Sequence, residues 1–285
     1  MIKGLILDVD GVLVGGKQGY NWPNPHPQII QALKLLRKKG ITVSLCTGKG
    51  TFAIKDIVLS ANLDNVHIGD GGALVVDIIH NKIIDQHIIK SPDVKSVVKT
   101  LLSEGIYIEL YTQDGYFIQK DQIGEKTTKH KDILYKEPFV VNSLEKVAND
   151  LQIVKIMPVA DDENQKKIIS NLFEPYQKNL TLQWGVHPIA LPYQFGMITS
   201  KGISKKHAAL VISQHTGIPL SEMLGVGDSM SDWLFMEICG FVGAMGNASQ
   251  ELKEKVLSKK ESGYIGKSVD ENGLIDILDH FDLLD

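Results

Sequence analysis

The sequence predicts an α/β fold in which one largely parallel sheet is interrupted by an inserted α+β domain. Two observations support this prediction. Short apolar runs alternate with amphipathic helical stretches at the start of the chain, and the same rhythm returns after residue 197. The roughly one hundred residues between these parts mix the periodicities of helices and strands, and a segment of that length is itself of domain size.

The first part of the chain begins with a buried strand. Residues 2–7 form an apolar run that ends at Asp8. Residues 27–39 place apolar side chains at helical spacing, and Gly40 is a typical stop signal. The elements expected next are a strand, a helix and a strand, at 41–46, 51–60 and 66–68. Strands and helices that alternate in this way usually form a parallel sheet.

The middle of the chain has a different pattern. Residues 73–79 and 83–89 flank an Asn81-Lys82 turn and predict a β-hairpin. Beyond the hairpin, helices are expected at 93–104, 143–150 and 163–173, and strands at 106–111, 115–119, 153–157 and 180–186. Helices and strands mixed in this way indicate an α+β domain.

The last part returns to the α/β pattern. Residues 203–215 predict a helix, and MLGVG at 223–227 predicts a buried strand that ends at Asp228. The remaining elements expected are helices at 231–238, 249–258 and 271–281 and a strand at 240–244. We therefore expect residues 1–86 and 195–285 to form one α/β core, and residues 87–194 to form the inserted domain.

The composition excludes several classes of protein. Among 285 residues, 43% are hydrophobic and 22% are charged, which is enough to bury a core. A net charge of −4 argues against a nucleic-acid partner. No signal peptide or membrane span is recognisable, so a cytoplasmic protein without a membrane partner is expected. Cys46 and Cys239 lie in apolar runs and are expected to be buried free thiols. Nothing in the sequence indicates an oligomeric state.

Two pairs of acids follow predicted strands, and open α/β sheets bind ligands at the carboxyl ends of their strands. Asp8 and Asp10 leave the first strand together. A divalent cation makes neighbouring carboxylates compatible, and a carboxylate can attack phosphorus. Asp228 directly follows another strand, and Asp232 lies one helical turn later on the same face. The simpler interpretations are turn acids for the first pair and acids favoured by a helix dipole for the second.

Two further groups would supply a hydroxyl and positive charge. Thr47-Gly48 offers a hydroxyl and backbone N–H groups at an expected helix start, which suits phosphate, although by itself an ordinary threonine cap is the simpler interpretation. Lys201, Lys205 and Lys206 cluster near the start of another helix. A lysine there would balance a phosphate, or the cluster would only line a solvated face. The shared position of all four groups after strands favours a phosphate site.

In their order these motifs resemble those of the haloacid dehalogenase (HAD) superfamily, in its Cof-like branch with a type IIB cap. The four motifs are DVDGVL at 8–13, Thr47-Gly48, the Lys205 of GISK, and GDSMSD at 227–232. AMGNAS at 244–249 and DENG at 270–273 are similar to two further stretches of the family. The resemblance implies a Rossmann-like parallel-sheet core with an inserted α+β cap that sets substrate specificity.

The resemblance also implies the roles of the acids. Asp8 would be the nucleophile that forms an aspartyl-phosphate, and Asp10 the general acid that then activates water as a base. Asp8, the backbone carbonyl of Asp10, and Asp228 would bind Mg²⁺, with Asp232 in support. The implied activity is a Mg²⁺-dependent phosphohydrolase that cleaves phosphate monoesters of a small metabolite, such as a sugar phosphate.

The remaining motifs are expected to bind the phosphoryl group. Thr47 and Gly48 would hold its oxygens, and Lys205 would neutralise charge between nucleophile and phosphate. We prefer Lys205 to Lys201 because it aligns with the lysine of the family's motif three. Five residues depart from the usual pattern without removing a catalytic group: Val12, Lys49, Asp70, Lys206 and Ser231.

Two alternatives to a phosphatase are compatible with the motifs. A sugar phosphomutase of the same fold would return its phosphoryl group to a sugar, would need a bisphosphorylated activator and would release little phosphate. A binding module would keep the fold without turnover. Because all four acids, Thr47 and a candidate lysine are present, the binding module ranks last.

Overall fold

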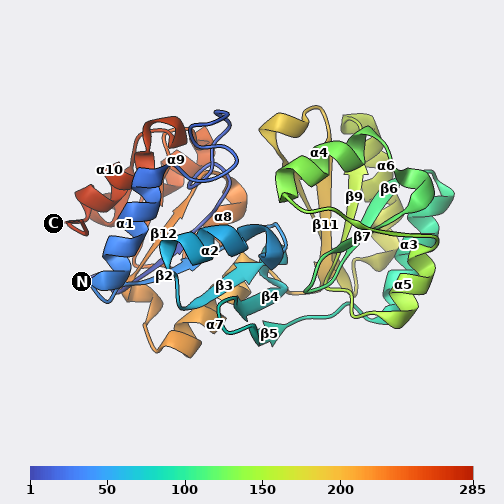
Figure 1. The fold of residues 1–285 in the computed structure, drawn as a ribbon, viewed down its shortest axis with the longest axis horizontal. Coiled ribbons are helices and arrows are strands. Elements are labelled where there is room, and N and C mark those ends of the chain that lie inside the picture. The colour runs from blue at the N-terminus through green and yellow to red at the C-terminus, as the bar shows by residue number, and fades with distance from the viewer. Residues whose placement is uncertain (285) are drawn as a thin grey trace. The chain divides into compact units, whose positions relative to one another are not determined.

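The structure is a computed structural model that describes residues 1–284 (Figure 1). The described chain forms two compact units. The first, here called the core unit, consists of residues 1–47 and 54–85 and the segment that begins at 204. The second, here called the cap unit, consists of residues 48–53 and 86–203. No helix within residues 1–284 is both long and apolar enough to span a membrane.

The core unit is built on a five-stranded parallel sheet in the order β14-β13-β12-β1-β2. Its strands are β1 (Gly4–Leu7), β2 (Thr42–Leu45), β12 (Met223–Gly227), β13 (Phe241–Ala244) and β14 (Gly263–Ile265). β1 pairs with β2 on one side and β12 on the other, so the two ends of the chain meet in one sheet (Figure 1). β1 and β12 are buried along their whole length, which explains their continuous apolar sequences.

The helices of the core unit bury one apolar face each. They are α1 (Pro27–Lys38), α2 (Lys55–Ala61), α7 (Lys205–Thr216), α8 (Met230–Met236), α9 (Gln250–Leu257) and α10 (Gly273–His280). α1 begins with a proline at its first position and buries Ile29, Ala32, Leu33 and Leu36, the helical spacing expected from the sequence. The two cysteines are buried free thiols, as predicted.

The expected third strand does not become a member of the parallel sheet. It forms a separate three-stranded sheet, in the order β3-β4-β5, of β3 (Val66–Gly69), β4 (Leu74–Asp77) and β5 (Lys82–Gln86). Only one parallel bridge, Cys46↔Ile68, joins β3 to the end of β2. The reason is local, because the positive φ angles of Asp70, Gly71 and Gly72 reverse the chain directly after β3, and β4 then pairs with it antiparallel.

The cap unit has a six-stranded sheet in the order β10-β11-β9-β6-β7-β8, mostly antiparallel. Its strands are β6 (Tyr107–Tyr111), β7 (Tyr116–Gln119), β8 (Phe139–Val141), β9 (Lys155–Ala160), β10 (Leu180–Val186) and β11 (Gln194–Ser200). Its helices are α3 (Ser91–Ser103), α4 (Glu125–Leu134), α5 (Leu144–Asp150) and α6 (Glu163–Phe173). Apolar residues of α3, α5 and α6 pack with Ile108, Leu110 and Ile156 of the sheet and form its core.

Four elements were not expected from the sequence: α4, β8, β11 and β14. α4 is mostly polar, and its buried positions include the polar residues Thr127 and His130, so it lacks the usual apolar stripe. β8 has no buried residue, and β14 has only three residues. β11 contains Gly196, where a Cβ would lie 2.8 Å from the ring of Pro158, and a glycine weakens the local strand signal. Pairing with neighbouring strands, which is not visible locally, decides the three strands β8, β11 and β14.

Candidate active site

Two aspartates lie where β1 and β12 end. Asp8 follows β1, is 6% exposed, and its backbone N–H donates to Val226 O of β12 at 3.0 Å. Asp228 follows β12, and a Cβ built on Gly11 would come within 2.0 Å of its Oδ2 atom. Only glycine fits there, since Gly11 also has a φ of +82°. The loop after β1 and the end of β12 are therefore in close contact at these acids.

Asp232 lies in the first turn of α8 and is completely buried. Its Oδ2 atom accepts hydrogen bonds from the backbone N–H groups of Asp228 and Ser229, at 3.1 and 3.0 Å, and from the Ser229 hydroxyl at 3.0 Å. This is a capping box, in which the side chain satisfies the open N–H groups of a helix start. One oxygen of Asp232 thus has a structural role, and the other remains for the site.

Lys205 is the first residue of α7 and joins two of these acids. Its Nζ atom donates to Asp8 Oδ1 at 2.6 Å and to Asp232 Oδ1 at 2.7 Å. The lysine is 7% exposed, so both contacts are made away from bulk water. The structure brings Lys205 to the acids, whereas Lys201 is exposed in the turn before α7. Lys206 points elsewhere and donates to Glu237, the residue that follows α8, at 2.7 Å.

Thr47 follows β2 and is 1% exposed. Its N–H donates to Ile68 O at 3.0 Å, and its carbonyl accepts from the Gly71 N–H at 3.1 Å. The expectation of a helix start at this point is wrong, because the next helical turn begins only at Thr51 and α2 at Lys55. Backbone contacts to the β3 region, and not a helix cap, therefore position the threonine.

Gly48 belongs to the cap unit by its contacts. Its carbonyl oxygen accepts a hydrogen bond from the Lys155 Nζ atom at 2.9 Å. Lys155 is fully buried in β9, and its ammonium also lies 3.7 Å from the centre of the Tyr111 ring. A desolvated cation over an aromatic ring is a favourable contact. This lysine, for which the sequence gives no local signal, thus helps to orient Gly48.

Besides Lys155, the cap sheet carries a buried glutamate, Glu109 of β6. Both carboxylate oxygens of Glu109 are engaged, Oε1 by the Tyr107 hydroxyl at 2.9 Å and Oε2 by the Tyr111 hydroxyl and by His130 Nδ1, both at 2.7 Å. Glu109 is fully buried and alternates along β6 with Ile108 and Leu110, which face the helices. The opposite face of the cap sheet is therefore polar and aromatic.

The pKa values in the core unit follow from burial and from crowded negative charge. Burial, and then the charge of Asp232, raises the pKa of Asp8 well above its ordinary value. The same two causes raise the pKa of Asp228 to about 7. Burial lowers the pKa of Lys205, but Asp232 and Asp8 outweigh that effect and hold it well above its ordinary value. The ammonium therefore stays charged, and the crowded acids ionise less readily unless further positive charge is present.

A divalent cation would supply positive charge that favours the ionised form of these acids. Asp8, Asp228 and Asp232 each offer a carboxylate oxygen, and the three oxygens lie within 4.8 Å of one another. An all-oxygen donor set suits Mg²⁺. Asp8 and Asp228 are the better ligands, because Asp232 is already bonded through both oxygens. Asp10 lies near enough for its charge to raise the pKa of Asp228, and its backbone carbonyl was the predicted ligand.

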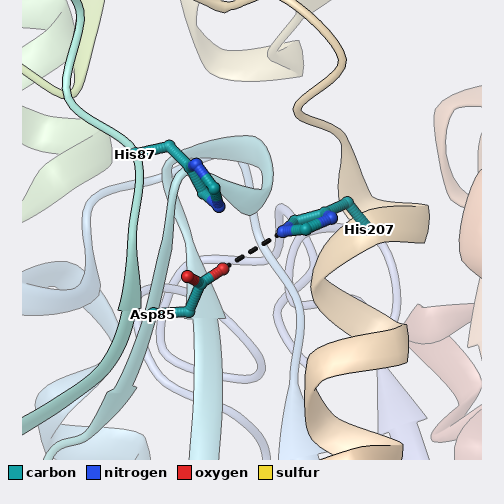
Figure 2. A group of neighbouring side chains, drawn as sticks. All are labelled: Asp85, His87 and His207. Carbon is teal, nitrogen blue, oxygen red and sulfur yellow. Dashed lines mark hydrogen bonds and ion pairs between the residues drawn. The ribbon is translucent and has the colours of Figure 1, made fainter.

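A further polar pair lies elsewhere in the core unit. His207 Nε2 and Asp85 Oδ2 are 3.1 Å apart and join the first turn of α7 to β5 (Figure 2). The two residues are 122 positions apart in the sequence, so no local pattern links them. His87, also drawn in Figure 2, lies two residues beyond Asp85 in the chain. The pair fixes the first turn of α7, two residues after Lys205.

The core unit thus combines a parallel sheet, aspartates at the ends of β1 and β12, and a buried lysine at the start of α7. The model of the haloacid dehalogenase-like hydrolase family matches residues 5–278, and the chain belongs to that family. Among its relatives is the 5-amino-6-(5-phospho-D-ribitylamino)uracil phosphatase YwtE of Bacillus subtilis, 26% identical over 98% of this chain and 97% of that protein. Phosphatase YwpJ of the same organism is 24% identical over 88% of this chain and 92% of its own length.

Solved structures show the same fold. The HAD subclass IIB sugar phosphatase BT4131 superposes with a TM-score of 0.79 at 23% identity, over 99% of both chains. BT1666 of Bacteroides thetaiotaomicron, described among the phosphatases of the superfamily, gives a TM-score of 0.77 at 22% identity, over 99% of this chain and 96% of that one. The chain thus has the same fold, with a parallel-sheet core and an additional cap sheet. Together with the family match and the phosphatase relatives, this assigns the chain to the HAD-type phosphatases.

Proposed function

We propose that the protein is a Mg²⁺-dependent phosphohydrolase that cleaves phosphate monoesters of a small metabolite through an aspartyl-phosphate on Asp8. The observation that carries the proposal is the buried lysine bridge, in which Lys205 holds Asp8 at 2.6 Å and Asp232 at 2.7 Å beside Asp228. A nucleophilic carboxylate and a phosphate monoester repel each other. A fixed ammonium in a site of low water content reduces that repulsion.

The first half of the reaction is a displacement at phosphorus. Lys205 engages Asp8 Oδ1, so Oδ2 is the attacking atom. Its bond to phosphorus forms as the bond to the leaving oxygen breaks, and Asp10 donates a proton to that oxygen. Thr47 holds a phosphoryl oxygen through its hydroxyl, with Gly48 beside it. Bound Mg²⁺, held by Asp8, the Asp10 carbonyl and Asp228 with Asp232 in support, would neutralise charge on the phosphoryl group.

The second half regenerates the enzyme. Asp10, now ionised, takes a proton from water, and the water oxygen attacks the phosphorus of the aspartyl-phosphate. The bond between phosphorus and Asp8 breaks, inorganic phosphate leaves, and Asp8 is again a carboxylate. Lys205 remains in contact with Asp8 and prevents the carboxylate from turning away between the two steps.

The substrate class is inferred from the relatives. One is named for a phosphorylated ribitylamino compound, and one solved neighbour is named a sugar phosphatase. These names support a phosphate ester of a sugar or of a sugar-derived compound. We assign the choice among such substrates to the inserted cap of residues 87–194, and the polar and aromatic face of its sheet supports this assignment.

The test is phosphate release from a panel of sugar phosphates and p-nitrophenyl phosphate, with Mg²⁺ and with EDTA. Wild type should release phosphate only with Mg²⁺, and Asp8→Asn should release essentially none. A matched control is Asp56→Asn, which changes an exposed aspartate in the first turn of α2 and should keep full activity. A phosphoryl adduct on Asp8, trapped by acid quench and seen by mass spectrometry, would identify the nucleophile.

Two results would contradict the proposal. Substantial turnover by Asp8→Asn would remove Asp8 as the nucleophile. An absence of phosphate release by wild type across the panel would reject the phosphohydrolase. In that case a gain of phosphoryl transfer with a bisphosphorylated sugar activator would identify a mutase of the same fold.

A further inference from the structure

Asn247 lies in the loop between β13 and α9 and contacts three separate segments of the core unit. Its Nδ2 atom donates to Gly11 O at 3.0 Å and to Asp228 Oδ2 at 3.4 Å. Its Oδ1 atom accepts from the Val269 N–H at 2.8 Å. One side chain therefore joins the loop after β1, the aspartate after β12, and the segment after β14.

The orientation of this amide follows from its backbone partners. The Val269 N–H can only donate, so the atom facing it is the amide oxygen. The Gly11 carbonyl can only accept, so the atom facing it is the amide nitrogen. That nitrogen carries two hydrogens. Once one is directed at Gly11, the second is directed at Asp228, the carboxylate that lies against the Gly11 backbone.

The loop that carries Asn247 is itself held at several points. Gly246 N–H donates to Lys267 O at 2.8 Å, and Ser249 N–H donates to Asp228 O at 3.0 Å. A Cβ at Gly246 would lie 2.7 Å from the backbone of Lys267, so the two segments are in direct backbone contact. The backbone of the loop is thus held in place, so the Asn247 side chain can orient the Asp228 carboxylate.

The segment that holds Asn247 has a second, separate anchor. Asn21, 1% exposed, donates through Nδ2 to Val269 O at 3.2 Å and to Asp270 Oδ1 at 2.8 Å. Asn21 and Asn247 therefore hold the same segment, Asn21 at the carbonyl of Val269 and Asn247 at its N–H group. Only Asn247 also contacts Asp228. Replacing Asn21 therefore tests the loss of a contact to this segment alone, whereas replacing Asn247 also removes the contact to Asp228.

We propose that Asn247 is a positioning residue for the metal site, which holds the Asp228 carboxylate against the loop after β1 so that it faces Asp8. The inference rests on the proposed Mg²⁺ requirement. Residues that hydrogen-bond a metal ligand typically account for a 10- to 100-fold change in metal affinity. The contact to Asp228 is a single hydrogen bond at 3.4 Å, so the effect belongs at the lower end, about 10-fold.

The experiment compares Asn247→Ala with Asn21→Ala in the full chain. Mg²⁺ affinity is measured without substrate, by calorimetric titration and by the rise in Tm on adding Mg²⁺. Asn247→Ala should bind Mg²⁺ about 10-fold more weakly, and Asn21→Ala should bind it as wild type does, although both lose a contact to the same segment. Turnover of Asn247→Ala should be low at limiting Mg²⁺ and should recover at saturating Mg²⁺, with KM for the phosphate ester unchanged.

The outcomes separate this inference from the proposed function. Wild-type Mg²⁺ affinity in Asn247→Ala would overturn the inference, as would an equal loss in Asn21→Ala. If wild type itself binds no Mg²⁺, the metal site and the inference both fail. If wild type binds Mg²⁺ but releases no phosphate, only the proposed function fails. The Tm in EDTA checks folding. If the alanine variant does not fold, Asn247→Ser replaces it, with the same expected loss, because a hydroxyl is too short to span these partners.

Discussion

The side chain of Asp232 shows how one residue serves both structure and chemistry. Oδ2 closes the first turn of α8, and Oδ1 receives the Lys205 ammonium. Its spacing from Asp228 predicted a second metal ligand on the same helical face. In the structure it also has the partners of a helix cap and of a lysine anchor. Among the hydrogen bonds described within residues 1–284, Asp8 and Asp228 each accept a single one through the side chain, so they are the acids better suited to bind a cation.

At the same scale, replacing Lys205 should lower the free energy of unfolding, because the buried acids lose the cation that neutralises them. Lys205→Met leaves two buried carboxylates without their cation, and we expect a loss of about 3 kcal/mol in the free energy of unfolding at neutral pH. Lowering the pH lets Asp8 take up a proton, since its pKa is already raised, so the difference from wild type should shrink. Urea unfolding at neutral and mildly acidic pH measures both effects.

The matched control is Lys201→Met, which removes the exposed lysine that competed with Lys205 in the sequence analysis. It should change the free energy of unfolding by less than about 0.5 kcal/mol at either pH. Equal effects of the two substitutions would show that Lys205 does not neutralise the buried acids.

At the scale of elements, the start of α7 is set by a glycine. A Cβ at Gly72 would lie 2.3 Å from Ser204 O and 3.1 Å from the Lys205 backbone nitrogen. Ser204 is the residue that caps α7. The turn after β3 therefore packs directly on the backbone that presents Lys205, and only glycine, with a φ of +107°, allows it.

Gly72→Ala should accordingly damage both stability and turnover. We expect a loss of about 2 kcal/mol in unfolding free energy, from backbone strain and the clash. We also expect a fall in kcat, because Lys205 moves relative to Asp8. Gly217→Ala is the control: Gly217 ends the same helix with a φ of +69° and has open space around it. It should cost about 1 kcal/mol and leave kcat unchanged; an equal fall in kcat would mean that the Gly72 contact does not place Lys205.

Helices and strands with a strong local apolar pattern were predicted from the sequence, and those with a weak pattern were not. β1 and β12 are buried along their whole length and their apolar runs predicted them, while α1 has a clear apolar stripe. α4 and β8 have weak local patterns and were missed. Thr47 was placed at a helix start because strand-to-helix turns are usual in α/β folds, yet a longer segment precedes the helix.

At the scale of the whole molecule, the parallel sheet collects the site from distant parts of the chain. The strand ends after β1, β2 and β12 and the first residue of α7 contribute Asp8, Thr47, Asp228 and Lys205. This concentrates acids at one edge of a protein whose net charge is only −4. Binding of a divalent cation there should therefore stabilise the entire fold, because the unfolded chain has no such site.

The stabilisation should depend on pH in a defined direction. Asp228 has a folded pKa of about 7 against an ordinary 3.8, so the metal-free folded protein keeps a proton that the unfolded chain releases. The contribution of this group to stability is present at low pH and is lost as the pH rises towards about 7. Mg²⁺ competes with that proton, so the rise in Tm on adding Mg²⁺ should be larger at about pH 7.5 than at about pH 5.5.

This prediction is checked by thermal unfolding with Mg²⁺ and with EDTA at each pH. The difference between the two Tm values removes the pH effects of groups that do not contact the metal. With Mg²⁺ at 100 times its dissociation constant, the added stability should be about 2.7 kcal/mol. Asp228→Asn should lose most of the rise at both pH values. A rise that is independent of pH in wild type would show that no proton is displaced.

The sequence by itself determined the α/β rhythm, the inserted segment and the residues of the motifs, because burial periodicity and turn chemistry are local properties of the chain. Only the tertiary structure decided which lysine reaches Asp8, how Asp232 divides its two oxygens, that β3 leaves the parallel sheet, and that Asn247 faces Asp228. Each of these depends on contacts between residues distant in sequence. Such contacts are set by sheet order and close backbone packing, which no local pattern records.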